Sequence, residues 1–385
     1  MRYWTGLLAA AALAALAPAP PLAIARAPVD ARASGAGARP APAQPVRVIL
    51  DTDMWGDIDD VLALAMLHAL QDRGEARLLA VTGSTDDASS AAFIAALNGF
   101  YGRPAIPVGL VRGGVTAERT ARRFPFLNAA APYTEALTRA AKADGSPLFP
   151  RAAEGGGAAP DAVALLRRTL AAQPDGSVVI IQIGFATNLA RLLDSGGDAA
   201  SPLDGAGLVR RKVRLLSVMA GGYADARGRP LAKSAPEYNL ELDVPAARAL
   251  FDRWPTPIVA SGFEVGVSMR IDGRAIDRLL GHSAPNPVLM AYHHVDPVYR
   301  TIRPTAPGAL HDHATFDLTA VLHAVRPDGG YFTLSAPGRI SVAADGSSRF
   351  AAQPGGTHRY LKIDDSMRPR TLEAMTLLAS QPPAR

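Results

Sequence analysis

The 385-residue sequence contains no cysteine. Disulfide bonds, thiolate metal ligands and a cysteine nucleophile are therefore excluded. Aromatic residues make up only 6% of the chain, and no dense run of Lys or Arg is interleaved with them. Because the formal net charge of +5 is spread along the chain, we expect no nucleic-acid partner. Beyond the N-terminal segment, no apolar stretch is long enough to cross a bilayer.

The N-terminal segment is typical of a secretory signal peptide. Arg2 precedes an apolar stretch at 7–16, and small residues that could be cleaved follow it. The stretch is short for a membrane anchor and ends in prolines. We predict that residues 1–27 are a cleaved signal peptide and that 28–45, rich in Ala, Pro and Gly, are a flexible linker. The mature protein is then expected to be exported to the periplasm or secreted, with no membrane attachment.

From Val46 onward, short β-branched runs alternate with helical patterns. Strands are predicted at 46–50, 76–83, 106–111, 177–184, 213–222 and 257–266, and helices at 59–70, 89–102, 133–143, 160–172, from 187, and at 244–254. With an apolar content of 48%, this alternation predicts one α/β domain over 46–385. Its central sheet should be mainly parallel, with helices on both faces. YFTLS (331–335) and RISVAADGSSRF (339–350), the latter with a D-G turn signal, predict a small antiparallel C-terminal appendage before a last helix at 369–380.

The stretch ILDTDMWGDIDD, residues 49–60, places five aspartates within ten positions directly after the first predicted strand. In open parallel sheets, ligands bind beyond the carboxyl ends of the strands, and GFATN and MAGGY follow two other strands. Carboxylates this close repel one another and need a counter-charge. Because the stretch has no Cys or His, a hard cation with oxygen ligands is favoured, calcium before zinc.

The aspartates admit three other interpretations. Capping of the following helix explains one or two acids, not five. Asp51, Asp53 and Gly56 match positions one, three and six of an EF-hand calcium loop. Trp55 and Leu62 do not fit its positions five and twelve. A D-x-D phosphatase of the haloacid-dehalogenase type is a less favoured alternative, since Trp55 stands where Thr or Val is usual.

The stretch VILDTDMWGDIDDVLALAM resembles the N-terminal signature of the inosine–uridine-preferring nucleoside hydrolase family. IGFATNLARLL, LLSVMAGGY, PEYNLELDVPAARALF and FDLTAVLHAV resemble later motifs of that family in the same order, over about residues 46 to 335. The resemblance implies a nucleoside hydrolase-like, Rossmann-related fold and a calcium-dependent N-glycosidase. Such an enzyme hydrolyses small-molecule ribonucleosides to ribose and free base, in purine or pyrimidine salvage. It also implies a homo-oligomer, either a dimer or a tetramer.

The same resemblance implies roles for individual residues. The implied calcium ligands are Asp53, Asp60, the backbone oxygen of Thr187, and Asp317. Asp53 would also be the catalytic base that activates a water. The implied substrate-binding residues are Asp59 on the ribose hydroxyls, Glu237 and Asn239 on the sugar, and Met219 along the ribose pocket. Asp51 would not bind the metal itself but would interact with the metal ligands and help to orient them.

The chain departs from the family pattern at three places, one of which is TGSTDDASS after the second predicted strand, where the family often has an asparagine that contacts the sugar. Two extra residues in the first motif introduce Asp57, which could take a metal or sugar role or cap the helix. Asn188 could similarly cap a helix or support the site.

Phe316 stands before Asp317, where many relatives have a histidine that acts as the leaving-group acid. His311 or His313 could protonate the base instead, and Phe316 could stack on it. The missing histidine leaves open a second class of function, a nucleoside- or sugar-binding protein with little or no turnover.

Overall fold

A mainly parallel sheet forms the centre of the structure. The computed structural model describes residues 44–123, 132–149, 159–282, 285–306 and 308–384. Ala43–Arg385 form one unit by their contacts. Among the described residues, the sheet has ten strands, of which nine follow the order β11 (Ser348–Ala352), β10 (Gly338–Val342), β12 (His358–Lys362), β6 (Ile258–Ser261), β5 (Val213–Met219), β4 (Val178–Ile183), β1 (Val46–Thr52), β2 (Ala76–Asp86) and β3 (Val108–Thr116). The tenth strand, β9 (Thr333–Leu334), pairs with β12.

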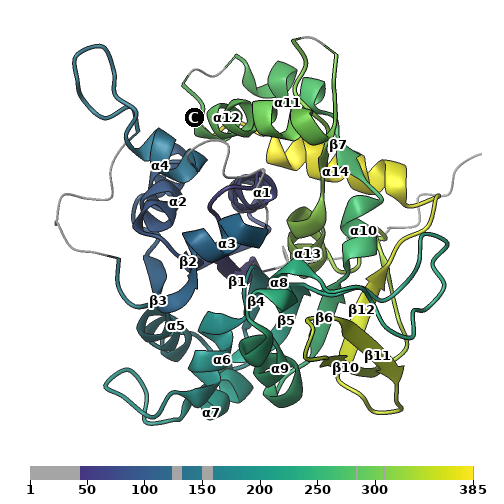
Figure 1. The fold of residues 1–385 in the computed structure, drawn as a ribbon. Helices are drawn as coiled ribbons and strands as arrows, with labels where there is room; N and C mark the ends of the chain where they lie inside the picture. The colour runs from purple at the N-terminus through teal and green to yellow at the C-terminus, as the bar shows by residue number, and fades with distance from the viewer. Residues whose placement is uncertain (1–43, 124–131, 150–158, 283–284, 307, 385) are drawn as a thin grey trace, which may run out of the picture. The chain divides into compact units, whose positions relative to one another are not determined.

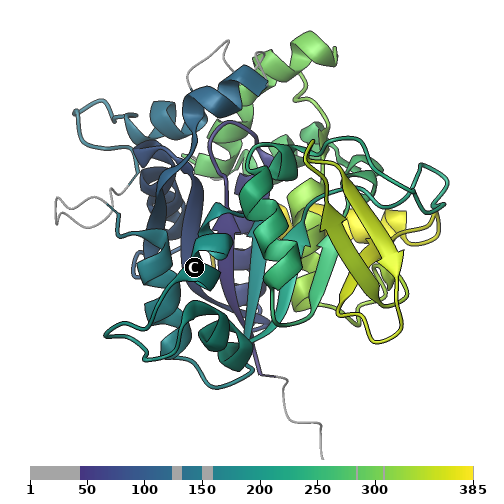
Figure 2. The same ribbon diagram turned by 60° about the horizontal axis from the view of Figure 1, so that its bottom comes forward.

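The parallel part of the sheet runs from β12 to β3, and its β1 lies between β2 and β4 (Figures 1 and 2). The antiparallel strands are at the C-terminal end of the chain, where β10 pairs with β11 and β12. The predicted antiparallel C-terminal part is thus present, and it is joined to the main sheet because β12 pairs in parallel with β6. The predicted α/β fold class is therefore confirmed, with the C-terminal strands joined to the parallel sheet.

The alternating side chains of the central strands enter two hydrophobic cores, one on each face. Val48 and Leu50 of β1 enter the first core, whereas Ile49 between them enters the second. The first core includes α1 (Asp59–Asp72), α2 (Ala88–Phe100), α11 (Gly273–Leu280), α12 (Pro287–Ile302), α13 (Phe316–Val325) and α14 (Arg368–Ala379). The second core includes α5 (Ala162–Ala171), α6 (Thr187–Asp194), α7 (Gly205–Lys212) and α9 (Val244–Arg253). Helices thus cover both faces, as the sequence predicted.

The remaining elements are short: α3 (Ala117–Arg123), α4 (Tyr133–Thr138), α8 (Tyr238–Glu241), α10 (Phe263–Val267), β7 (Arg270–Ile271) and β8 (His313–Ala314). Two of them correct predicted boundaries. The strand predicted at 257–266 ends at Ser261, and its remainder forms α10. The helix predicted at 133–143 ends at Thr138.

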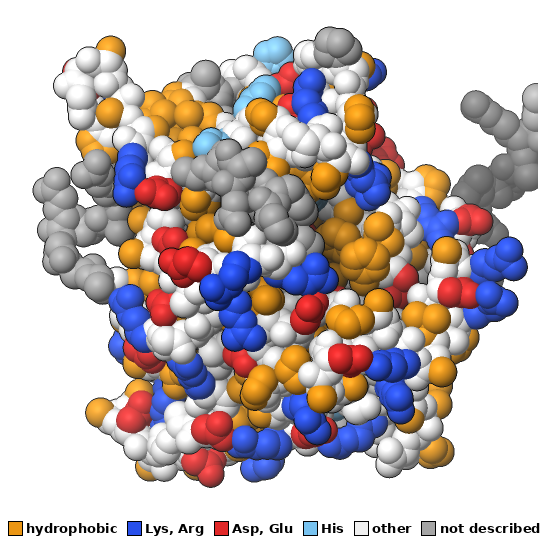
Figure 3. Space-filling view, viewed as in Figure 1, with side chains coloured by type: hydrophobic (Ala, Val, Ile, Leu, Met, Phe, Trp, Pro, Cys, Tyr) orange, Lys and Arg blue, Asp and Glu red, His pale blue; other side chains and the backbone are white. Residues whose placement is uncertain are grey.

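The predicted signal peptide and most of the predicted linker lie outside the described residues. In the part of the chain that the structure does describe, no helix has both the length and the apolarity needed to span a membrane. Acidic and basic side chains are interspersed over the face drawn in Figure 3.

Candidate functional site

The aspartate-rich stretch lies at the carboxyl end of β1, in the middle of the sheet. Thr52 ends the strand, and Asp59 and Asp60 are the first two residues of α1. Both aspartates are buried, at 5% and 3% exposure. The strand therefore delivers the carboxylates to the edge where ligands bind in open parallel sheets.

Three buried carboxylates converge there from two parts of the chain. Asp59, Asp60 and Asp317 each offer an oxygen, and these oxygens lie within 4.8 Å of one another. Asp317 comes from the first turn of α13, which packs against α1. Asp60 accepts a hydrogen bond from the Thr52 hydroxyl, and the nearby Asp53 carboxylate repels it and raises its pKa. The predicted ligands Asp53, Asp60 and Asp317 are thus brought together by the fold.

The electrostatics of this cluster call for a cation. Burial, followed by repulsion from neighbouring carboxylates, raises the pKa of Asp53, Asp59, Asp60 and Asp317 well above the usual value. A divalent ion would supply the missing positive charge, and an all-oxygen donor set suits a hard ion. The residues present therefore fit the implied metal.

Close approach of β4 to the aspartate loop requires a glycine. A Cβ on Gly184 would lie only 2.4 Å from the backbone nitrogen of Asp53 and 2.6 Å from the Ser84 hydroxyl. The GFATN motif therefore begins with a residue that lets Asp53 sit against the end of β4.

A pocket opens over the carboxylates. Its lining includes the predicted residues Asp53, Asp57, Asp59, Asp60, Met219, Glu237, Asn239, Phe316 and Asp317. It also includes Trp55, Gly56, Thr120, Ile183, Tyr238 and Phe263, to which the sequence assigned no site role. Tyr238 could have been found as the middle residue of the E-Y-N motif. Phe263 was hidden inside an expected strand.

Glu237 and Asn239 are fixed by local hydrogen bonds. Glu237 caps α8 by accepting from the Asn239 backbone N–H, and its Oε2 accepts from the Gly221 N–H at 2.9 Å. Burial raises the pKa of Glu237 to about 7. The Asn239 amide donates to the Met219 backbone oxygen at 3.1 Å. These contacts hold both side chains at the ends of β5 and α8, where they line the pocket.

Asp51, Asn188 and Thr187 lie beside this lining. The Asn188 amide donates to Asp51 Oδ1 at 2.7 Å and to the Gly83 oxygen at 3.1 Å, so Asn188 supports the site and does not cap α6. Burial raises the pKa of Asp51 to about 7, although hydrogen bonds from Thr82 and Asn188 oppose this shift. The Thr187 hydroxyl donates to Asp243, and calcium binding by its backbone oxygen stays a prediction.

An aromatic pair forms another side of the pocket. Phe316 stacks on Phe263 with ring centroids 5.2 Å apart and planes 28° apart. Phe263 is 50% exposed, an unusual exposure for a large apolar side chain. Gly266 permits this contact, since its Cβ would lie 2.5 Å from the Phe316 Cα. Phe316 is therefore placed where it can stack on a flat ligand.

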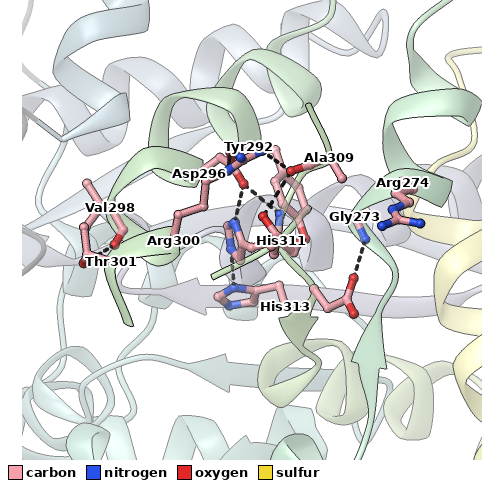
Figure 4. A network of polar contacts seen from close by, with 12 residues as sticks. Gly273, Arg274, Tyr292, Asp296, Val298, Arg300, Thr301, Ala309, His311 and His313 are labelled. Atoms are coloured by element: carbon pink, nitrogen blue, oxygen red, sulfur yellow. Dashed lines mark hydrogen bonds and ion pairs between the residues drawn. The ribbon is translucent and has the colours of Figure 1, made fainter. Parts of the chain in front are cut away.

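His311 and His313 form a buried hydrogen-bonded pair. His311 Nδ1 contacts Asp296 at 3.0 Å, and its Nε2 contacts His313 Nδ1 at 3.2 Å (Figure 4). His313 Nε2 lies 3.0 Å from Asp57 Oδ1 and 3.9 Å from Asp59 Oδ1. The pair thus reaches the pocket through the two aspartates, and Asp57 faces His313.

Comparisons with known proteins agree with this geometry. The family model described as inosine–uridine preferring nucleoside hydrolase matches residues 48–367. A plant nucleoside hydrolase structure is 20% identical, with a TM-score of 0.62, and the match covers 88% of this chain and 100% of that one. A purine-preferring ribonucleoside hydrolase from Gardnerella vaginalis is 18% identical, with a TM-score of 0.62, and the match covers 87% of this chain and 98% of that one. An inosine–uridine preferring nucleoside hydrolase from Bacillus anthracis is 15% identical, with a TM-score of 0.58, and the match covers 87% of this chain and 99% of that one.

A comparison with curated proteins finds no significant match. The structural matches support the fold, and the family model covers well over half of the sequence. The chain belongs to the inosine–uridine preferring nucleoside hydrolase family and is an enzyme of the type that hydrolyses N-glycosidic bonds.

Proposed function

We propose that this enzyme is a calcium-dependent hydrolase that cleaves ribonucleosides to ribose and free base. The observation that carries the proposal is the group of buried carboxylates on Asp59, Asp60 and Asp317, with oxygens within 4.8 Å of one another. These carboxylates line a pocket that Glu237 and Asn239 also line. Oxygen ligands alone favour calcium over a softer metal.

Four residues hold the ion in this proposal: Asp53, Asp60, Asp317 and the backbone oxygen of Thr187. Bound calcium would supply a Lewis acid that orients the sugar and lowers the pKa of a water. Asp53, which lines the pocket beside Asp60, accepts a proton from the attacking water.

The sugar is held by carboxylates and an amide. Breaking the bond between C1′ and the base builds positive charge on the sugar ring, which nearby negative groups stabilise. Asp59 accepts hydrogen bonds from the 2′- and 3′-hydroxyls, and Glu237 and Asn239 bind the opposite side of the sugar. Met219 packs along the ring. Phe316, stacked on Phe263, provides an aromatic face for the leaving base.

The test is an assay of ribose release from a panel of purine and pyrimidine nucleosides with calcium present. Asp53→Ala should lower kcat by about 10²–10⁴, the range for a lost general base. Asp365→Asn, a change at a side chain that is 95% exposed, is the matched control and should keep wild-type activity. Chelation should stop release in the wild type. Thermal stabilisation by nucleosides without ribose release would instead support the binding-protein alternative, and magnesium-dependent phosphate release would support the phosphatase alternative.

Export and assembly are part of the same proposal. A cleaved leader at residues 1–27 would release the enzyme into the periplasm or the medium, which N-terminal sequencing of protein from each cell fraction tests. A dimer or tetramer is expected, and sedimentation analysis of the mature chain tests it.

A further inference from the structure

A second group of metal-binding side chains lies next to the carboxylates already described. Asp57, Asp59 and His313 each offer one ligand atom, and these atoms lie within 4.8 Å of one another. Asp57 belongs to the loop after β1, Asp59 begins α1, and His313 begins β8. Asp59 is shared with the group that contains Asp60 and Asp317.

The His313 ring leaves one nitrogen without a proper hydrogen bond. His313 is only 4% exposed, and among the described residues its Nε2 has no hydrogen-bond partner of acceptable geometry, although Asp57 Oδ1 is 3.0 Å away. In a metal site, each ligand atom lies about 2.0–2.2 Å from the ion. If the angle between two ligands at the ion lies between the octahedral and the tetrahedral value, the two ligand atoms are about 3.0–3.4 Å apart. Such ligand atoms point at the ion and not at each other. His313 Nε2 and Asp57 Oδ1 match this arrangement, because they are 3.0 Å apart and yet do not meet the angle required of a hydrogen bond.

The His311–His313 pair determines how the His313 ring is turned. Asp296 Oδ1 lies 3.0 Å from His311 Nδ1, and His311 Nε2 lies 3.2 Å from His313 Nδ1. Because Nδ1 of His313 is engaged by His311, Nε2 is the nitrogen that faces Asp57 and Asp59.

Ring contacts and hydrogen bonds hold the His311–His313 pair in place, and Figure 4 shows the pair with Asp296 and Tyr292. Tyr299 stacks on His311 with centroids 4.5 Å apart and planes 7° apart, and it contacts His313 edge to face at 5.0 Å. The Tyr292 hydroxyl donates to the His311 backbone oxygen at 2.7 Å. A histidine metal ligand is commonly oriented in this way, through a hydrogen bond from its other ring nitrogen.

We propose that Asp57, Asp59 and His313 form a second cation site, which takes a divalent transition metal such as Zn²⁺ and lies beside the all-oxygen site. Imidazole nitrogen suits zinc, copper, iron and nickel better than calcium. Three protein ligands leave a coordination position open. The Asp57 side chain is 36% exposed and lines the pocket, so that position can be reached by a water or a ligand hydroxyl. The site requires no turnover and goes beyond the proposed function.

The test is a calorimetric titration of the chelator-treated full chain with ZnCl₂ in saturating calcium. One Zn²⁺ should bind per chain, and His313→Gln should weaken its binding by at least about tenfold. Asp57→Asn should do the same and carries the test if His313→Gln does not fold. His293→Gln is the matched control, because this histidine lies on α12 and is 54% exposed. Co²⁺ in place of Zn²⁺ should give a visible absorption band in the wild type that His313→Gln abolishes.

Two results would overturn the inference: no Zn²⁺ bound by the wild type, or equal affinity in both site variants and the wild type. Either would leave His313 as a protonated partner of Asp57. Ribose release by a chain that binds no Zn²⁺ would overturn the proposed second metal site and support the proposed calcium-dependent hydrolase. Zn²⁺ binding without ribose release would support the second metal site and overturn the proposed hydrolase activity.

Discussion

Asn188 joins three parts of the structure through one side-chain amide. It belongs to α6, and it donates to Asp51 at the end of β1 and to the Gly83 backbone oxygen of β2. Both acceptors are buried, so water does not replace the amide if it is removed. The side chain therefore acts on the position of the strand ends that carry the site.

Asn188→Ala is expected to lower the free energy of unfolding by about 1–3 kcal/mol, because buried acceptors then lack a donor. Urea unfolding measures this change. Gln173→Ala is the control, because the Gln173 amide donates only a long hydrogen bond of 3.4 Å, to the Thr169 backbone oxygen of the preceding helix α5. The control should stay within about 0.5 kcal/mol of the wild type. Equal unfolding midpoints for Asn188→Ala and the wild type would contradict this account.

Phe263 is the exposed member of the aromatic pair at the pocket. Phe263→Ala is expected to raise KM for nucleosides about threefold to tenfold, since an aromatic contact contributes about 0.5–1.5 kcal/mol. kcat should change little, because the carboxylates are untouched. Steady-state kinetics measure both quantities. Leu377→Ala, at a side chain on α14 that is 51% exposed, is the control, and an unchanged KM for Phe263→Ala would refute the base-stacking role.

At the scale of elements, the junction between β10 and β12 depends on a neutral histidine. His358 on β12 is 3% exposed, and its Nδ1 accepts a hydrogen bond from the Ile340 N–H of β10 at 3.0 Å. Burial lowers the pKa of His358 to about 4. Protonation would remove the acceptor, so acid should weaken the contact between these strands.

The sign of the pH effect follows from the two pKa values of His358. An unfolded histidine has a pKa of about 6.5, so between that value and about 4 the unfolded chain binds more protons than the folded chain. The stabilisation is complete above about pH 6.5 and decreases as the pH falls toward 4, by about 1 kcal/mol per pH unit. Urea unfolding at pH 7 and 5 should show a smaller loss in His358→Asn, whose amide can accept without titrating. Parallel losses in both proteins would argue against His358 as the cause.

Elements with one clear periodicity could be predicted from the sequence, and mixed ones could not. The apolar run of β4 and the helix at 59–70 were both found, whereas α12 was missed because Pro297 interrupts its pattern. A short apolar run such as PIVASGFEVG does not distinguish strand from helix, so α10 was read as strand. The aspartates were visible because they are local in sequence. The contacts of Asp296 with His311, and of Phe263 with Phe316, exist only after folding.

At the scale of the whole molecule, the buried carboxylates predict that stability depends on a cation. Removing calcium with EGTA is expected to lower Tm, because Asp53, Asp60 and Asp317 then repel one another in a buried site. Calcium at a hundred times its Kd should restore about 2.7 kcal/mol. Differential scanning calorimetry measures both shifts.

A double variant, Asp60→Asn with Asp317→Asn, controls for this effect. Its Tm without calcium should exceed that of the calcium-free wild type, since two like charges are removed, and added calcium should no longer raise it. A wild-type Tm that does not respond to EGTA would be inconsistent with a structural role for the cation.

The parallel pairing of β12 with β6 has a consequence for synthesis of the chain. β12 ends at Lys362, whereas β6, beside which it lies, ends 101 residues earlier at Ser261. Until β12 leaves the ribosome, β6 is an unpaired edge that other strands could join. The sheet can therefore be completed only after residue 362 has been synthesised. We expect chains that stop before residue 358 to aggregate and not to yield a smaller active enzyme.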